Sequence, residues 1–184
     1  MEYNKYKDLV KKYYKNDCRE LNFQNRVIIP FLESILPEEY EVVDSSTIYK
    51  NWENYKDDVG NGVCREKFAN KYTPDLLVIK EWKLFSENKN IPLIIIEVKR
   101  PTAKDRAHAI KEVKEYLEKA DHVILTDSIT WEFYEKQNDE KIPPIYLGKD
   151  KKMVCERDLT VERIVDWVEE RVWEELQERI KALI

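Results

Sequence analysis

Two short segments hold the residues best suited to chemistry: YTPD at positions 72–75 and IEVK at positions 96–99. Side chains alternate faces along a β-strand, so Glu97 and Lys99 should point to the same side. Asp75 begins an apolar run, and Glu97 ends the most hydrophobic run of the chain. If the two runs pair as a hairpin, the start of one strand meets the end of the other. The spacing therefore predicts Asp75 beside Glu97, with Lys99 next to them.

Such a group favours a divalent cation. Two neighbouring carboxylates raise each other's pKa unless a cation lies between them. Mg²⁺ prefers oxygen ligands and keeps several of its waters. A lysine beside it can position or deprotonate an attacking water, or stabilise charge that builds on a phosphate. Taken singly, Pro-Asp is an ordinary turn or strand start, and Glu-x-Lys is a common solvated strand edge. Their combination, with an isoleucine-rich strand leading into Glu97, favours the metal site.

Helices and strands alternate around these residues. Apolar residues recur at helical spacing in four stretches, 3–14, 21–35, 102–120 and 161–183. Short apolar runs predict strands at 41–48, 75–80, 91–98, 122–126 and 130–134. Pro30 should bend the second helix, because proline donates no backbone hydrogen bond. We therefore expect an α/β fold, in which a mixed central β-sheet is flanked by helices on both faces.

The chain length of 184 residues suits a single compact domain over 1–184. Residues 50–71 are polar and contain Gly60 and Gly62, so we expect a long loop or an insertion there. The last predicted helix, at about 161–183, is amphipathic and long for a lone surface helix. Its tryptophans, Trp167 and Trp173, leave open a protein interface and with it a homodimer.

The overall charge limits how nucleic acid could be bound. The formal net charge is −5, whereas a protein that binds nucleic acid over its whole surface is usually basic. A contact must therefore come from a local basic patch, and the candidates flank the two motifs: Arg65, Lys67, Lys71, Arg100, Lys104, Arg106, Lys111 and Lys114. A solvated helix face, balanced by Asp105, Glu112 and Glu115, explains the later lysines equally well.

Several other classes of protein lack their signatures here. Three glycines are too few for a glycine-rich phosphate loop. Three cysteines without close pairing argue against a disulfide framework and against a zinc site. His108 and His122 have no metal-ligand spacing with each other or with a cysteine, so we expect ordinary polar or packing roles. The N-terminus has no apolar signal core and no stretch reaches membrane-span length, so we expect a cytoplasmic protein.

Pro74-Asp75, followed after 22 positions by Glu97-Val98-Lys99, resembles the PD-(D/E)XK nuclease superfamily. Two flanking segments resemble one branch of it, the N-terminal nuclease domain of type I restriction motor subunits and its stand-alone relatives. They are ELNFQNRVIIP at 20–30 and ADHVILTDSITWEFY at 120–134. The resemblance covers about 20–134. It implies a restriction-endonuclease-like fold and Mg²⁺-dependent cleavage of phosphodiester bonds, with Mn²⁺ as a substitute, most simply in double-stranded DNA during restriction, defence or related DNA processing.

The resemblance also implies the role of each site residue. Asp75, Glu97 and Val98 would bind the metal, and Lys99 would be the catalytic lysine. Glu20 would be an accessory acid that holds a second metal or a metal-bound water. The local alternative for Glu20 is a capping box with Asp17, since the two stand in the N-cap to N3 relation. An acid on the core-facing stripe of a helix needs a partner, which favours the site role.

The chain departs from this family at one informative position. Relatives often carry Gln-x-x-x-Tyr on the helix after the lysine, whereas this chain has Glu112 four residues before Tyr116. The contact of that glutamine is therefore in question. Two other functions stay open: a catalytically idle nuclease-fold module that binds nucleic acid, and a protein-interaction subunit of a larger nuclease or defence assembly.

Overall fold

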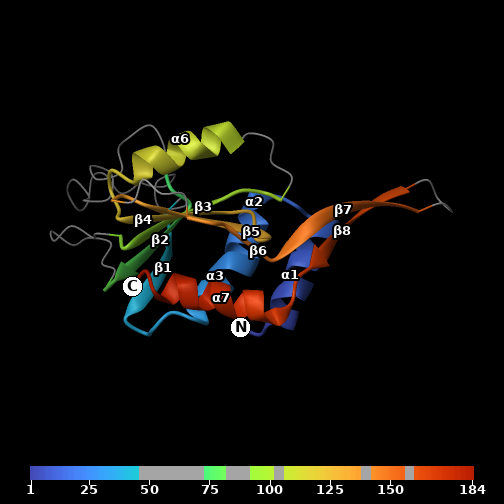
Figure 1. Ribbon diagram of the computed structural model, residues 1–184, viewed down its shortest axis with the longest axis horizontal. Coiled ribbons are helices and arrows are strands. Elements are labelled where there is room, and N and C mark those ends of the chain that lie inside the picture. The colour runs from blue at the N-terminus through green and yellow to red at the C-terminus, as the bar shows by residue number, and fades with distance from the viewer. Residues whose placement is uncertain (46–72, 82–91, 102–105, 138–141, 156–159) are drawn as a thin grey trace, which may run out of the picture.

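The computed structural model describes residues 1–45, 73–81, 92–101, 106–137, 142–155 and 160–184 (Figure 1). Its larger sheet has the strand order β1-β2-β3-β4-β5-β6. The strands are β1 (Tyr40–Asp44), β2 (Leu76–Lys80), β3 (Ile94–Val98), β4 (His122–Thr126), β5 (Thr130–Glu135) and β6 (Ile145–Tyr146). A separate two-stranded sheet pairs β7 (Gly148–Cys155) with β8 (Thr160–Trp167). The predicted insertion at 50–71 lies outside the described residues.

The larger sheet is mixed, as predicted. β3 and β4 run parallel, and the other neighbouring pairs run antiparallel. The parallel pair is connected through α6 (Arg106–Tyr116), because parallel strands need a crossover connection. Every residue of β3 is buried. This agrees with the expectation of a central strand covered on both faces.

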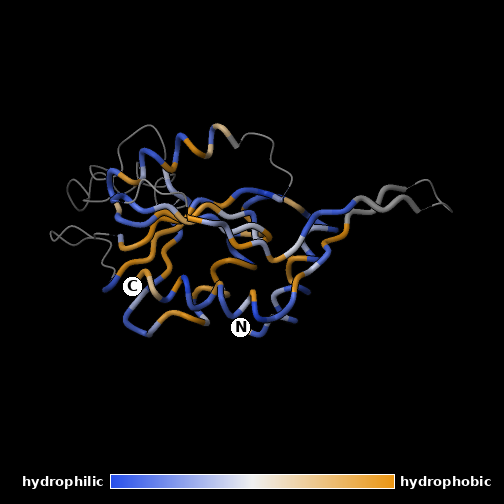
Figure 2. Tube along the Cα trace, viewed as in Figure 1, coloured by the Kyte–Doolittle hydropathy of each residue, from blue (hydrophilic) through white to orange (hydrophobic). Residues whose placement is uncertain are grey.

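Helices cover both faces of the larger sheet (Figure 1). α6 packs on one face through Ala109, Val113 and Tyr116. The other face carries α1 (Tyr3–Asn16), α2 (Glu20–Phe23), a π-helical segment η1 (Gln24–Ile28), α3 (Ile29–Glu33) and α7 (Glu170–Lys181). Figure 2 shows the hydrophobic stretches gathered in the strands between these two layers. Alternation along the strands places two separate apolar clusters on the two sides.

The second predicted helix is divided rather than simply bent at Pro30. Its middle part, η1, is π-helical, and α3 then begins one residue before Pro30. Since proline donates no hydrogen bond within a helix, a wider turn before it is one way to satisfy the backbone. The burial of Phe23, Val27 and Phe31 persists through the change of helix type. The segment therefore keeps its apolar side on the sheet.

The single C-terminal helix predicted over 161–183 is wrong in its first half. Residues Thr160–Trp167 form β8, and only Glu170–Lys181 form a helix, α7. β-branched residues such as Val161, Ile164 and Val165 suit a strand as well as the apolar side of a helix. The spacing of apolar residues alone therefore predicted the wrong element here. At the base of the hairpin, a Cβ on Gly148 would lie 2.6 Å from Val165 Cγ1. Glycine thus permits the close approach of β7 to β8.

The tryptophan of α7 belongs to the core rather than to a protein interface. Trp173 is 2% exposed, and its ring stacks on Tyr3 at 5.4 Å and lies 4.5 Å from the ring of Phe31. Trp131 and Phe133 of β5 are also buried. The interface predicted from Trp173 is therefore not available at that residue. Among the described residues, no helix is long and apolar enough to cross a membrane.

We expect Tyr6→Phe to destabilise the fold measurably. The Tyr6 hydroxyl is fully buried and donates to the backbone oxygen of Ser128 at 2.7 Å, tying α1 to the β4–β5 turn. Removing the donor leaves a buried carbonyl without this bond, which costs about 1–3 kcal/mol. Urea unfolding measures the loss. Tyr146→Phe, at a tyrosine that is 53% exposed, is the matched control, and equal stability of both variants would contradict the anchoring role.

Candidate active site

The pairing of β2 with β3 places Asp75 across from Glu97. Leu76 pairs with Ile96 in antiparallel register, so the next positions outward on the two strands are these two acids. The end of β1 holds the start of β2: the Ser45 hydroxyl donates to the Pro74 oxygen at 2.6 Å, and the Ser45 amide donates to the Asp75 oxygen at 3.1 Å. The position of Asp75 therefore depends on three strands.

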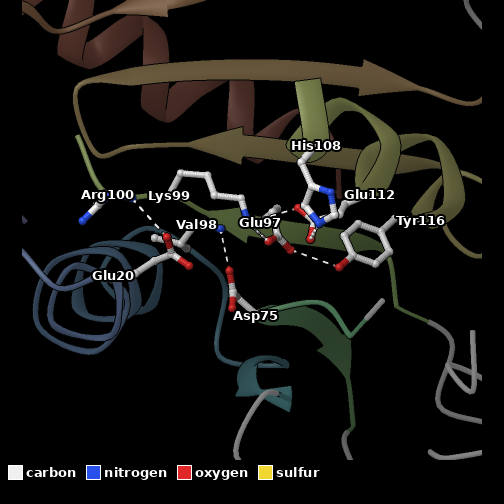
Figure 3. Close-up of polar contacts among 9 residues, drawn as sticks. All are labelled: Glu20, Asp75, Glu97, Val98, Lys99, Arg100, His108, Glu112 and Tyr116. Atoms are coloured by element: carbon white, nitrogen blue, oxygen red, sulfur yellow. Dashed lines mark hydrogen bonds and ion pairs between the residues drawn. The ribbon is translucent and has the colours of Figure 1, made fainter. Parts of the chain in front are cut away.

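Glu97 and Lys99 point toward α6 (Figure 3). Glu97 is 3% exposed and forms an ion pair with Lys99. Its other carboxylate oxygen accepts a hydrogen bond of 3.1 Å from the Tyr116 hydroxyl. The Lys99 ammonium also lies 3.1 Å from Glu112 Oε2. Lys99 is held in strand geometry beyond β3, because its amide donates to the Thr126 oxygen at 2.8 Å.

Two further carboxylates are fixed by backbone amides at the end of β3. The Val98 amide donates to Asp75 Oδ2 at 2.8 Å, and the Arg100 amide donates to Glu20 Oε2 at 3.3 Å. The structure thus brings Glu20, Asp75, Glu97 and Lys99 to one place from α2, β2 and β3 (Figure 3). The capping box is wrong, because α2 begins at Glu20 and its N-cap is Arg19, not Asp17.

Burial and like charge set the electrostatics of this group. Burial raises the pKa of Asp75 to about 6, and Glu20 adds to the effect while the Val98 amide opposes it. Burial and then the Asp75 carboxylate raise the pKa of Glu97 well above its ordinary value. Burial alone would lower the pKa of Lys99, but Glu97 and Glu112 outweigh it and raise the net value. Lys99 is therefore a cation, and a charged Asp75 disfavours the ionisation of Glu97.

This donor set fits a hard divalent cation that keeps some of its waters. Among the described residues, no three histidine, cysteine, aspartate or glutamate side chains are arranged to hold a metal ion by themselves. Asp75 and Glu97 offer only oxygen, and the buried side chain of Val98 leaves its main-chain carbonyl as the donor. Mg²⁺ is commonly held by one or two carboxylates, with water completing its octahedron. A cation would also relieve the repulsion between the two acids.

No protein-family model, curated protein or solved structure matches this chain. The resemblance to the nuclease superfamily therefore rests on the sequence motifs alone.

The basic residues predicted to contact nucleic acid differ in how they lie relative to the site. Arg100 is exposed directly after Lys99, beside the carboxylate of Glu20. Lys111 and Lys114 are exposed on α6, whose buried side carries Glu112 and Tyr116. Arg106 begins α6, but its side chain lies outside the described part of the structure, as do all atoms of Arg65, Lys67, Lys71 and Lys104. Among the described candidates, Arg100 has the most direct connection to the site.

Two residues that received no site role in the sequence prediction contribute to the group. Tyr116 donates to Glu97, and Glu112 is the second carboxylate at Lys99. His108, expected to be an ordinary polar residue, has Nε2 3.4 Å from Glu112 Oε1. The signal was present in the sequence: His108, Glu112 and Tyr116 recur every four residues and so share one face of a helix.

Asp75→Asn should stabilise the metal-free protein by about 1–3 kcal/mol at neutral pH. The raised pKa means that folding disfavours the charged form of this carboxyl. Asparagine keeps an oxygen that can accept from the Val98 amide, yet it carries no charge. Urea unfolding in a chelator tests this, with Asp8→Asn on the exposed side of α1 as the control. A less stable Asp75→Asn protein would show that the cost of burying this charge does not dominate at this carboxylate.

Proposed function

We propose that this protein is a metal-dependent nuclease with a restriction-endonuclease-like fold that hydrolyses phosphodiester bonds, with DNA as the first substrate to test. One observation carries the proposal: Glu20, Asp75, Glu97 and Lys99 converge from three elements on the end of β3. Core packing does not require this convergence, since half-buried like charges are costly. A catalytic cation site does require it.

Each residue has a definite task in this proposal. Asp75 and Glu97, with the carbonyl of Val98, would hold Mg²⁺ or Mn²⁺, which when bound activates water and neutralises phosphate charge. Lys99 stabilises charge on the phosphate or orients the attacking water from its place beside Glu97. Tyr116 fixes the carboxylate of Glu97 by its hydrogen bond. Glu20, held by the Arg100 amide, accepts hydrogen bonds from water at the edge of the site.

A second candidate is a catalytically idle module that binds nucleic acid or another protein. The ion pairs favour it in one respect, because Lys99 already contacts two carboxylates, Glu97 and Glu112. A closed network of this kind can be purely structural. In that case the chain would bind its partner equally well with or without divalent cations.

A cleavage assay separates the two. The purified protein is incubated with linear duplex, closed circular and single-stranded DNA, and with RNA, in the presence of Mg²⁺ or Mn²⁺ and again with a chelator. Metal-dependent cleavage that disappears in Asp75→Ala protein, purified in parallel, supports the nuclease and rules out a contaminant. No cleavage of any of these substrates would refute the proposal and favour the idle module.

A further inference from the structure

One face of α6 is built around the ammonium group of Lys99. His108, Glu112 and Tyr116 follow one another at four-residue spacing, and two of them contact Glu97 or Lys99 at the end of β3 (Figure 3). The Tyr116 hydroxyl donates a hydrogen bond to one carboxylate oxygen of Glu97. The Oε2 atom of Glu112 lies 3.1 Å from Lys99 Nζ. The Glu112 side chain is 11% exposed and that of Lys99 17% exposed. The second ion pair is therefore well shielded from water.

The two counter-ions of Lys99 are not equivalent. Glu97 stands across from Asp75 at the proposed cation site, whereas Glu112 approaches Lys99 from the helix. When Glu97 binds a divalent cation, its negative charge is shared, and the nearby positive charge repels the ammonium. Lysine carries its charge on a flexible four-carbon stem and can turn toward water. Glu112 is the carboxylate that remains to oppose this movement.

Resting on the proposed function, we propose that Glu112 is a positioning residue, whose carboxylate keeps the Lys99 ammonium at the reaction centre while Glu97 is engaged with the metal. It touches neither metal nor phosphate and acts only through Lys99. A neutral side chain of the same size could still accept a hydrogen bond but would lack the charge. The lost interaction is the attraction between two opposite charges, which is stronger in a site shielded from water than in bulk solvent.

The decisive variant is Glu112→Gln, which keeps the side-chain size and removes a buried like charge near Glu97. At saturating Mg²⁺, kcat for DNA cleavage should fall about tenfold, while KM for DNA stays unchanged because Glu112 does not touch the substrate. Glu115→Gln, on the same helix but outside the ion-pair network of Lys99, is the matched control and should behave as wild type. Glu112→Ala, as a second variant, should lose at least as much activity as Glu112→Gln.

Two measurements do not depend on turnover. In the Mg²⁺-loaded wild type, the ¹H–¹⁵N signal of the Lys99 ammonium, assigned by its loss in Lys99→Ala, should be observable and slow to exchange; in Glu112→Gln it should broaden away. Calorimetry should show Mn²⁺ binding in Glu112→Gln with the stoichiometry of wild type. Loss of Mn²⁺ binding to the extent seen in Asp75→Ala would make Glu112 a metal ligand and overturn the inference.

The outcomes distinguish this inference from the proposed function. If the wild type cleaves DNA and Glu112→Gln retains its kcat and its ammonium signal, the positioning role is wrong and the nuclease stands. If the wild type cleaves no nucleic acid with either metal, both proposals are wrong. A fall in kcat together with an unchanged ammonium signal also contradicts the role assigned here, because Lys99 would then have stayed in place.

Discussion

Lys99→Ala should lower the rate of DNA cleavage by at least about a hundredfold, in line with the loss of a positioned electrostatic or proton-transfer group. Lys99 is the one ammonium in contact with both Glu97 and Glu112 in the described structure, and its pKa is raised, so it is charged at neutral pH. The variant leaves Asp75 and Glu97 in place. Mn²⁺ binding, measured by calorimetry, should therefore persist.

The control for this prediction is Lys80→Ala. Lys80 is the exposed last residue of β2, at the opposite end of the strand from Asp75. Its loss should change the cleavage rate less than about twofold, since a surface substitution away from a site has little effect. Full activity of Lys99→Ala would contradict the role proposed for this lysine, even though the protein would still be a nuclease.

Asp75→Ala should greatly weaken both metal binding and cleavage. The carboxylate is one of two that face each other at the strand ends, so its removal leaves Glu97 as the main anionic ligand. We expect Mn²⁺ affinity to fall by about a hundredfold or more. Even the loss of a residue that only orients a metal ligand lowers metal affinity by about 10–100-fold. Cleavage should fall by at least about a thousandfold, because the metal activates the water and also neutralises the phosphate.

Asp8→Ala is a suitable control for this variant, because Asp8 lies on the exposed side of α1. Calorimetry on the chelator-treated proteins gives the affinities, and the same preparations serve for the cleavage assay. If Asp75→Ala binds Mn²⁺ as tightly as the wild type, then Asp75 is not a ligand and the cation site must be sought elsewhere.

The sequence predicted the parts of the fold that depend on strong local patterns. The apolar run ending at Val98 identified a central strand, and the hairpin argument placed Asp75 opposite Glu97. These predictions succeeded because a strand that is buried on both faces admits few alternatives. The convergence of Glu20 with the strands could be inferred only through the resemblance, since no local rule connects residues that far apart.

The failures have physical causes as well. Thr160–Trp167 form a strand because they pair with β7. A local pattern of eight residues that includes β-branched ones does not reveal this tertiary pairing. The π-helical turn at Gln24–Ile28 has no simple residue code. The sequence alone does not predict a site role for Glu112, because its partner, Lys99, lies next to it only when α6 packs on the sheet.

The pairing of β2 with β3 has a consequence for how the protein can vary. Asp75 and Glu97 meet through the ladder between Leu76 and Ile96, and the chain joining the two strands leaves β2 after Lys80, at the opposite end. Lengthening that connection costs only about 0.6 kcal/mol per doubling and moves neither carboxylate. Because the ladder between β2 and β3 holds both carboxylates, a peptide tag or a targeting module could be inserted between Lys80 and Pro92 of this protein.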